Sequence, residues 1–353
     1  MKKIIGLLII LVLALSTVAY TAGTLPTEDK VAQTPNTLIA VGDLNFADGM
    51  GEKIMKDPSY PWAGTQEILN TANILVGNLE VPLSIRGKAY TEKTWILRAH
   101  PQTAKALVTA GFDVVALANN HIMDFGPPAL EDTLNTLKSM NILYSGAGMN
   151  LTEARKPAIL TTADGKTFAF LSYSLTFPDL FWATPSRPGT AHGGPQHFLP
   201  DIRKAKETAD YVIVSFHWSS EMLNYPKPYQ TSFARQCIDA GANIVLGHHP
   251  HVLQGLEVYH GGLIAYSLGN FAFGSLSNKV KDSIILAIDY DQSGLTQARL
   301  YPVNINNYEV AFQTKRRYGQ DAERVLGDLR LFSADFKTQI DSADGVGIIK
   351  IRP

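Results

Sequence analysis

The chain has 353 residues, and its 31 basic and 32 acidic side chains give a formal net charge of −1. No stretch gathers the basic residues into a stripe that would attract a phosphate backbone, which argues against a nucleic-acid partner. The single cysteine, Cys237, excludes an internal disulfide. We expect Cys237 to be a core residue, because free cysteine packs as a small apolar group.

The N-terminal residues predict export from the cytoplasm. Lys2 and Lys3 supply positive charge, the apolar run Ile4 to Tyr20 follows, and a polar, proline-containing stretch continues to Asn36. This order is typical of an export signal. The run is long for a cleaved signal and slightly short of the ~20 residues that span a bilayer. We interpret residues 1–22 as a signal peptide or N-terminal membrane anchor, favouring the anchor, and residues 23–36 as a linker.

Beyond the linker, short apolar runs alternate with amphipathic helical patterns. Runs bounded by turn residues predict buried strands at Thr37 to Val41, Ile74 to Gly77, Asp113 to Leu117, Tyr211 to Phe216 and Asn243 to Leu246. Apolar residues at helical spacing predict helices at Pro101 to Ala110, Pro127 to Met140 and Tyr229 to Ala240. This alternation is typical of βαβ units and indicates an α/β fold with a mixed sheet packed by helices.

Two hairpin signals, Ala163-Asp164-Gly165 and Gly261-Gly262, indicate antiparallel strands and therefore a second sheet. From Asp282 onward, strands around Asp291-Gln292-Ser293-Gly294 precede a helix at Gln320 to Phe332 and a strand at Gly347 to Ile351. No linker-like composition separates this part from the rest. We therefore interpret residues 37–300 as the main domain and residues 301–353 as a C-terminal extension of the same domain.

Ligand-type side chains follow each of the five strands predicted between Thr37 and Leu246. They are Asp43, Glu80, Asn119-Asn120-His121, His217 and His248-His249-Pro250-His251. Ligand groups in α/β sheets collect where strands end, so we expect these side chains to converge. Each alone has a structural alternative as a turn residue, a helix cap or a hydrogen-bonded core histidine. Their occurrence at every strand end favours a metal site.

The chemistry of this set indicates which metals it would hold. Oxygen and imidazole ligands together suit Mn, Fe or Zn better than a thiolate-loving ion. Two carboxylates would help to neutralise two adjacent divalent cations. We also expect His249 and His251 to face one site, because alternate residues of an extended segment point the same way.

The same segments form an ordered series of motifs. The series is Val41-Gly42-Asp43; Asn78-Leu79-Glu80; Ala118-Asn119-Asn120-His121 with Asp124 and Gly126; His217-Trp218 with Glu221; Gly247-His248-His249-Pro250-His251-Val252 with Gln254-Gly255; and Ser267-Leu268-Gly269-Asn270-Phe271. Over about Leu38 to Phe273 this series resembles the poly-γ-glutamate capsule-synthesis (CapA-type) family, which is similar to calcineurin-like metallophosphoesterases. The resemblance implies a four-layer α/β/β/α sandwich of the calcineurin-like metallophosphoesterase fold.

The resemblance also implies roles for individual residues. The implied ligands of two divalent ions are Asp43, Glu80 in the bridging position, Asn120, His217, His249 and His251. His121 is implied as the proton donor. Asp124 and Glu221 are candidates for carboxylates that orient imidazoles, with surface salt bridges as the alternative. We expect Asn45, Asn119, Trp218 and Asn270 to lie on the substrate side.

The chain departs from phosphoesterases at two of these positions. Where they have Asp-x-His, this chain has Asp43-Leu44-Asn45, so one imidazole ligand is missing, and Asn45 is the candidate to replace it. The bridging carboxylate, Glu80, is longer by one methylene than the usual aspartate. Both differences weaken the transfer of phosphoesterase activity to this chain.

Two further features bear on the substrate. Arg98 and Arg187 are candidates for binding an anionic substrate, because guanidinium pairs well with carboxylate or phosphate. The segment Ser174 to Leu199 lacks clear periodicity and carries several aromatic and histidine residues. It is interpreted either as a substrate-facing loop or as a surface loop held by its own aromatic side chains.

Two functions of different classes fit the pattern. The first is a metal-dependent hydrolase acting on an amide or ester linkage of an anionic polymer, poly-γ-glutamate by resemblance. The second is a non-catalytic scaffold that binds or guides that polymer during export, and an envelope phosphoesterase is a third alternative. A scaffold has no need for a non-ligating imidazole beside Asn120, so His121 favours the enzyme. We expect an extracytoplasmic, membrane-anchored or secreted protein that works with a polyglutamate synthetase.

Overall fold

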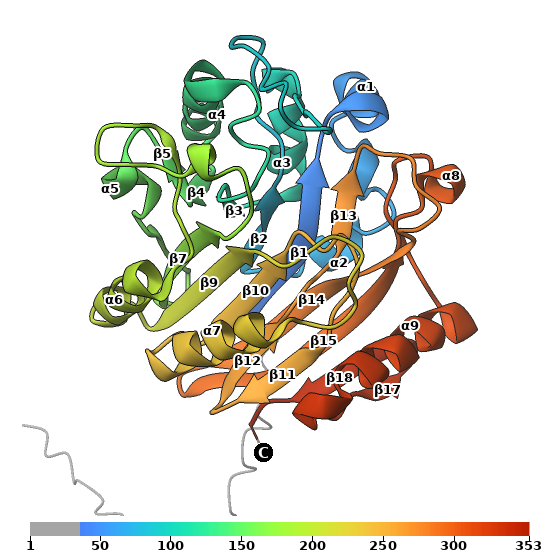
Figure 1. Cartoon of the computed structure of the whole chain (residues 1–353). Coiled ribbons are helices and arrows are strands. Elements are labelled where there is room, and N and C mark those ends of the chain that lie inside the picture. Colours follow the sequence, from blue (N-terminus) through green and yellow to red (C-terminus); the bar gives the residue numbers. More distant parts are fainter. Residues whose placement is uncertain (1–35, 353) are drawn as a thin grey trace, which may run out of the picture. The chain divides into compact units, whose positions relative to one another are not determined.

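The computed structural model describes residues 36–352, which belong to one compact unit (Figure 1). The predicted signal peptide or anchor, and the predicted linker except for Asn36, lie outside the described residues. Among the helices that the structure describes, none combines the length and the apolar character that a membrane span requires.

One large mixed sheet runs in the order β17-β18-β15-β14-β1-β2-β3-β4, with β13 paired to β1 and β16 paired to β15. Its strands are β1 (Asn36–Asn45), β2 (Ile74–Leu79), β3 (Val114–Ala116), β4 (Leu143–Ser145), β13 (Asn270–Phe273), β14 (Asp282–Asp291), β15 (Gly294–Asn304), β16 (Lys315–Arg316), β17 (Asp341–Ala343) and β18 (Val346–Lys350). Strands β1 to β4 are parallel, whereas β14 pairs antiparallel with β1. Strand β15 crosses residue 300, so the C-terminal residues continue the same sheet.

A second sheet runs in the order β11-β12-β10-β9-β7-β6. Its strands are β6 (Ala158–Thr161), β7 (Thr167–Ser174), β9 (Tyr211–His217), β10 (Ile244–His248), β11 (Leu256–Tyr259) and β12 (Gly262–Ala265). The short strands β5 (Ala147–Gly148) and β8 (Gly189–Thr190) form a separate pair. The expected hairpins are confirmed, because β6 and β7 pair across Asp164 and β11 and β12 pair across Gly261.

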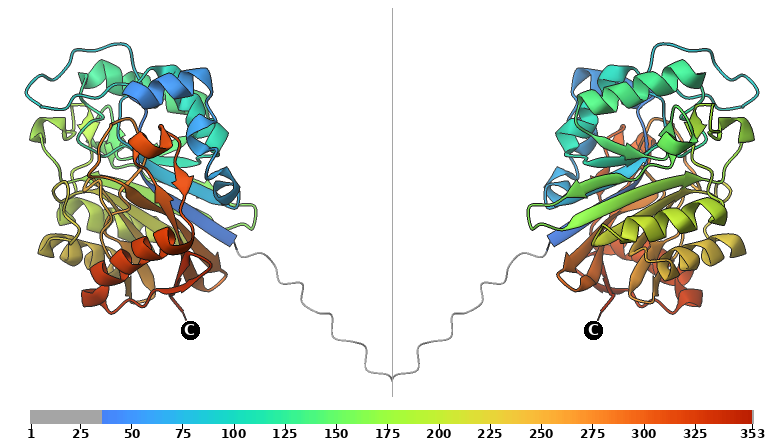
Figure 2. Two further views of the ribbon diagram at one scale, coloured as in Figure 1. Left: turned by 90° about the vertical axis from the view of Figure 1, so that its right-hand side faces the viewer. Right: turned by 90° about the vertical axis from the view of Figure 1, so that its left-hand side faces the viewer.

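Helices cover the outer faces of both sheets (Figure 2). The α-helices are α1 (Asp48–Lys56), α2 (Gln66–Leu69), α3 (Lys105–Ala110), α4 (Gly126–Ser139), α5 (Leu151–Ala154), α6 (Pro195–Lys206), α7 (Pro228–Asp239), α8 (Asn307–Val310) and α9 (Gly319–Phe332). The 3₁₀ helices are η1 (Tyr60–Trp62), η2 (Pro101–Ala104), η3 (Asp179–Phe181) and η4 (Ala334–Phe336). Proline in the first turn starts α4 and α7, since its fixed φ suits that position.

The alternation of side chains along the strands builds the layers. Leu38 and Ala40 of β1 pack against residues of the second sheet such as Phe168. Their neighbours Ile39 and Val41 face the opposite side, where α1, α3 and α4 pack. Helices α6 and α7 cover the outer face of the second sheet, and Cys237 is buried there as predicted. The result is the four-layer α/β/β/α sandwich implied by the resemblance.

The five strands and three helices predicted between Thr37 and Leu246 are confirmed as elements, with two differences of detail. The first is that Pro101 to Ala110 divides into η2 and α3. The second is that the segment Ser174 to Leu199, interpreted as a loop, contains η3, β8 and the first turn of α6. Phe198 and Ile202 of α6 are buried at helical spacing, but Pro200 inside the helix interrupts the pattern that sequence reasoning relies on.

A substitution at Gly42 tests whether β1 must lie close to the chain that enters β13. A Cβ atom at Gly42 would lie 1.9 Å from the carbonyl oxygen of Gly269, so Gly42→Ala must separate these segments and shift Asp43. We expect the free energy of unfolding to fall by about 1–3 kcal/mol, the usual cost of overpacking. The control is Gly327→Ala in α9, where a Cβ meets nothing within 4 Å. It should be neutral or stabilise by up to about 1 kcal/mol. Urea unfolding curves compare the two, and equal effects would contradict the prediction.

Candidate metal centre

The strand ends that carry the predicted ligands meet where the two sheets come together. In the first sheet Asp43 of β1 pairs with Asn78 of β2, and in the second His217 of β9 pairs with His248 of β10. The two sets meet directly, since His248 Nδ1 lies 3.0 Å from Asp43 Oδ1. The expected convergence of ligand-type side chains is therefore confirmed.

Asp43 is fully buried and held by groups from both sheets. Its Oδ1 accepts a hydrogen bond from Asn78 Nδ2 at 2.9 Å, and its Oδ2 lies 3.3 Å from His251 Nδ1. Burial raises the pKa of the Asp43 carboxyl, but hydrogen bonds with His248 and His251 outweigh it and hold that pKa well below its usual value. Asp43 is thus a carboxylate poised to act as a ligand.

Glu80 is also fully buried, but neither of its carboxylate oxygens has a hydrogen-bond partner. Its Oε1 lies 3.3 Å from His217 Nε2 and 3.9 Å from His251 Nε2. Burial, and then the nearby charge of Asp43, raise the pKa of Glu80 well above its usual value. A buried carboxylate without hydrogen bonds is costly unless a cation compensates it, so this residue fits a metal position.

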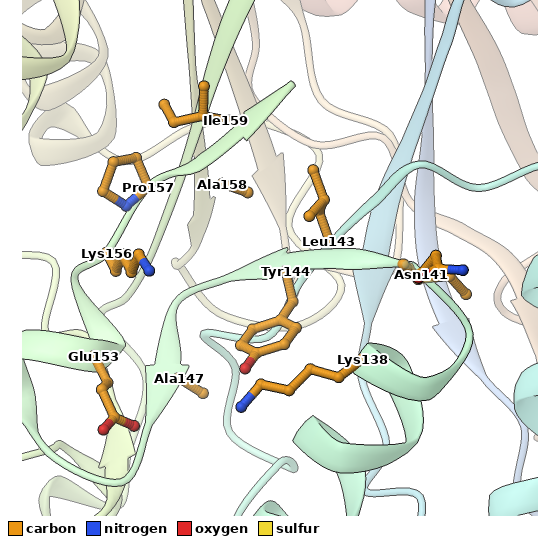
Figure 3. A pocket seen from close by; sticks show the side chains of 11 residues that line it. Lys138, Asn141, Leu143, Tyr144, Ala147, Glu153, Lys156, Pro157, Ala158 and Ile159 are labelled. Carbon is orange, nitrogen blue, oxygen red and sulfur yellow. The ribbon is translucent and has the colours of Figure 1, made fainter. Parts of the chain in front are cut away.

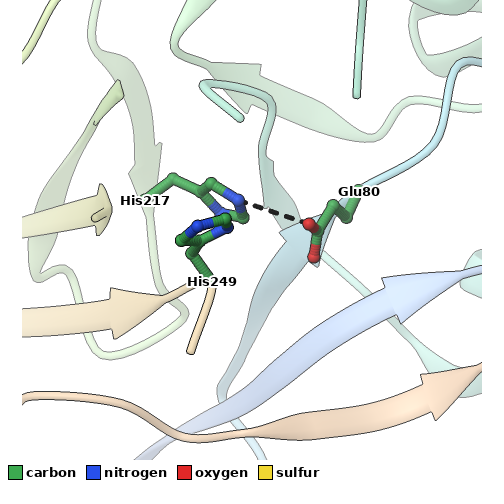
Figure 4. A group of neighbouring side chains, drawn as sticks. All are labelled: Glu80, His217 and His249. Atoms are coloured by element: carbon green, nitrogen blue, oxygen red, sulfur yellow. Dashed lines mark ion pairs between the residues drawn. The ribbon is translucent and has the colours of Figure 1, made fainter. Parts of the chain in front are cut away.

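Three imidazoles surround Glu80, and Figure 4 shows two of them, His217 and His249, beside its carboxylate. Burial lowers the pKa of His217 well below its usual value. Burial is also the main reason why the pKa of His249 is lowered to about 3. Burial also lowers the pKa of His251, but the charges of Glu80 and Asp43 outweigh it and raise that pKa to about 10. His249 Nδ1 is buried without a hydrogen-bond partner. Neutral imidazole is the form that binds metals, and the lowered pKa values of His217 and His249 favour that form.

His249 and His251 share one side for a reason that differs from the predicted one. The strand β10 ends at His248, and both His249 (φ 94°) and His251 (φ 59°) adopt the left-handed region. A tight turn around Pro250, not an extended segment, therefore brings the two imidazoles together. The convergence was predicted correctly, but its expected backbone basis was wrong.

The ligand atoms form two groups that share Glu80. They are Glu80, His217 and His249, and Asp43, Glu80 and His251, each with atoms within 4.8 Å of one another. Asn120 adds an amide oxygen 2.8 Å from His217 Nε2. Carboxylate and imidazole ligands in this arrangement, with the unpartnered Glu80 oxygens between them, fit divalent metal binding.

His121 lies beside this centre and is held by the carboxylate predicted to orient it. Its Nδ1 lies 2.6 Å from Asp124 Oδ2, and Asp124 is fully buried. Burial lowers the pKa of His121, and the hydrogen bond to Asp124 opposes part of that effect. The predicted contact between His121 and Asp124 is present, while the role of His121 as proton donor stays a prediction.

Lys93 is a component that sequence reasoning missed. Its ammonium lies 2.5 Å from Asp124 Oδ1 and 3.2 Å from His121 Nδ1, and it donates to the carbonyl oxygen of Asn120. Burial lowers the pKa of Lys93, while the charge of Asp124 opposes this. Lys93 lies on a loop without periodicity between β2 and η2, so no local pattern distinguished it from an exposed lysine.

Three residues expected on the substrate side are buried by contacts within the protein. Asn119 donates to Leu79 O at 2.9 Å, and its side-chain oxygen accepts hydrogen bonds from the backbone N–H groups of His121 and Ile122. Trp218 is fully buried, and its Nε1 donates to Tyr266 O at 3.0 Å. Asn45 is buried, and its side-chain oxygen accepts from Ala47 N–H at 2.9 Å. These contacts favour structural roles for all three and argue against Asn45 as a replacement for the missing imidazole.

The remaining candidates are Asn270, Arg98 and Arg187. Asn270 Oδ1 lies 2.8 Å from His251 Nδ1, so Asn270 orients an imidazole. Arg98 is exposed and stacks its guanidinium over Phe125. Arg187 is exposed and donates to Trp182 O at 3.0 Å. Substrate binding by the two arginines stays a prediction.

A separate pocket lies between the edge strands β4 and β6 (Figure 3). It is lined by charged and apolar side chains that include Lys138, Tyr144, Glu153 and Lys156, and it shares no residue with the ligand groups. This pocket is therefore separate from the ligand groups at the strand ends.

Comparisons with known proteins show what this chain is similar to. A family model described as bacterial capsule synthesis protein PGA_cap matches residues 37–275. The chain is 34% identical over 277 residues to the capsule biosynthesis protein CapA of Bacillus anthracis, covering 76% of this chain and 67% of that protein. It is 33% identical over 271 residues to the PGA biosynthesis protein CapA of Bacillus subtilis (strain 168), covering 75% and 70%. The crystal structure of 5'-nucleotidase from Candida albicans SC5314 has a TM-score of 0.45 and 11% identity, covering 86% of this chain and 58% of that one.

The Lys93–Asp124 pair provides a test of the loop that carries His121. Lys93→Met leaves the buried Asp124 carboxylate without its cation, so we expect the free energy of unfolding to fall by about 3 kcal/mol. The control is Lys88→Met, because Lys88 lies exposed on the same loop. It should change stability by no more than about 0.5 kcal/mol. Chemical denaturation measures both, and an unchanged Lys93→Met protein would mean that the pair contributes no stability.

Proposed function

The chain belongs to the bacterial capsule synthesis protein family PGA_cap, and from this membership we propose that it acts in poly-γ-glutamate capsule biosynthesis as a metal-dependent hydrolase. The proposed substrate is an anionic envelope polymer, poly-γ-glutamate. The observation that carries the proposal is the pairing of a buried ligand cluster with His121, an imidazole held by Asp124 beside that cluster. Ligands for divalent metal and a separate proton-transfer group are what a hydrolase of this kind requires.

The proposed mechanism divides the work between the metal centre and the protein. A bound divalent metal supplies Lewis acidity and a nucleophile at neutral pH by lowering the pKa of water. The residues that would hold divalent ions of Mn, Fe or Zn are Asp43, Glu80, Asn120, His217, His249 and His251. Asp124 holds His121 through Nδ1, which leaves Nε2 to carry the proton that the leaving group needs. Lys93 fixes Asp124 and the Asn120 carbonyl, and so positions the loop between them.

The substrate proposal follows from charge. Each unit of poly-γ-glutamate carries a carboxylate, and exposed guanidinium groups pair well with carboxylates. We assign Arg98 and Arg187 to this contact because both are exposed and neither is paired with an acidic side chain in the part of the chain that the structure describes. An envelope phosphoester would satisfy the same arginines. Its hydrolysis is less favoured, because Asn45 does not supply the imidazole that phosphoesterases have at the first motif.

The scaffold alternative shares the metal centre but not the use of His121. A structural metal needs ligands, whereas an oriented imidazole beside Asn120 serves proton transfer. Removing His121 therefore separates the two functions.

We expect two substitutions to have different effects. His249→Ala removes a proposed ligand, so it should lower both the content of bound divalent metal and the melting temperature, because metal binding is coupled to folding. His121→Ala should keep the metal and the melting temperature but lower hydrolysis of a γ-glutamyl substrate by about 10²–10⁴-fold, the usual cost of losing a general acid. Elemental analysis, thermal unfolding and an assay of polymer cleavage measure the three quantities.

The contrary outcomes have distinct meanings. Loss of metal in His121→Ala would make His121 a ligand. Full cleavage activity with metal retained would exclude His121 as the proton donor, whereas a wild-type protein that binds metal but cleaves no γ-glutamyl substrate would support the scaffold. A wild-type protein without stoichiometric metal, purified without chelator and offered Mn²⁺ or Zn²⁺, would remove the proposed centre altogether.

We also propose that the protein acts outside the cytoplasm, anchored to the membrane or secreted, beside a polyglutamate synthetase. The support is Lys2, Lys3 and the apolar run Ile4 to Tyr20, which lie outside the described residues. Cell fractionation should recover the protein with the membrane or in the medium. Full-length protein in the cytosol, soluble without detergent, would overturn this localisation.

A further inference from the structure

The loop after β9 brings a third carboxylate, that of Glu221, to the metal centre. Backbone contacts fix this loop against the neighbouring histidine turn: Met222 N–H donates to Pro250 O at 2.9 Å, and Ser219 N–H donates to Tyr229 Oη at 2.7 Å. Ser219 (φ 77°) and Met222 (φ 62°) both adopt the left-handed region that non-glycine residues rarely occupy. The position of Glu221 is therefore held by a strained and hydrogen-bonded backbone.

The Glu221 carboxylate forms a ligand group with two imidazoles. One of its oxygens and one nitrogen each of His249 and His251 lie within 4.8 Å of one another. Glu221 is exposed, whereas Asp43 and Glu80 are fully buried. The two imidazoles therefore lie within reach of both the buried carboxylates and an exposed one.

Two observations indicate that this third group binds a cation. His249 is about nine-tenths buried, and its Nδ1 has no hydrogen-bond partner. The first motif has Asn45 in place of the imidazole, and the side-chain oxygen of Asn45 accepts a hydrogen bond from Ala47 N–H. Among the described residues, Glu221 makes no hydrogen bond to an imidazole, which the predicted orienting role would require.

We propose that Glu221 is a metal ligand, and that its carboxylate binds a divalent cation together with His249 and His251 at the solvent side of the centre. This assignment rests on the proposed metal-dependent function and adds to it the ligand that substitutes for the imidazole missing at Asn45. It replaces the predicted role of Glu221 as an outer carboxylate. Because Glu221 faces solvent, the cation that it binds is the one nearest to an incoming polymer.

The first test measures Mn²⁺ binding to the full chain after removal of metal with chelator. Glu221→Gln keeps the size of the side chain but removes its charge, and we expect it to weaken binding of one Mn²⁺ at least tenfold by titration calorimetry. The metal-free melting temperature should stay unchanged. The control is Glu207→Gln, which removes an equal charge from an exposed position on the surface beyond α6. It should leave Mn²⁺ binding unchanged.

A second measurement separates a ligand from a residue that acts through a ligand, since loss of either weakens metal binding. Glu221→His offers a nitrogen in place of an oxygen, so with Co²⁺ as the probe it should retain binding and shift the visible d–d absorption. An unchanged Co²⁺ spectrum, or Mn²⁺ affinity in Glu221→Gln equal to wild type, would overturn the assignment and leave the rest of the centre standing. Absence of Mn²⁺ binding in the wild type would overturn the centre and the assignment together.

Discussion

The whole arrangement depends on placing two buried carboxylates, Asp43 and Glu80, at the junction of the two sheets. Burial in a medium of low dielectric disfavours charge on either group, and their proximity raises the cost further. Asp43 is compensated by His248 and His251, whereas the oxygens of Glu80 have no hydrogen bonds. The protein around Glu80 therefore contains a deficit of positive charge that Lys93 and the imidazoles meet only in part.

The surrounding fold makes such a concentration of charge tolerable. Both sheets present apolar side chains to each other and to the outer helices, so the polar groups are confined to the ends of the strands. The close approach of Gly42 to Gly269 lets β1 and the chain entering β13 come together beside Asp43. The absence of a side chain at Gly42 thus allows the close spacing of these two segments, on which the position of the Asp43 carboxylate depends.

The sequence predicted the strand ends and most proposed ligands because each polar residue interrupts a short apolar run, and that interruption is a local signal. It missed Lys93 because this residue contacts Asp124 only after its loop has folded back onto the site. Trp218 was expected on the substrate side, but successive residues at the end of β9 point to opposite faces, so Trp218 packs with Phe216 in the outer layer while His217 reaches the centre. The turn at Pro250 escaped prediction because left-handed histidines have no sequence signature. The sequence pattern alone could not predict how segments that lie far apart in the chain pack against each other.

The contact between Asp43 and His248 joins residues 205 positions apart in the sequence. Loops of this length close late in folding, because their entropic cost precedes any gain from the contact. The centre therefore has no tight site for an ion until the second sheet has docked against the first. A chain that crosses a membrane before it folds would reach that stage only on the far side. The ion it captured would then reflect the supply of metals in the compartment where folding ends, not in the one where synthesis begins.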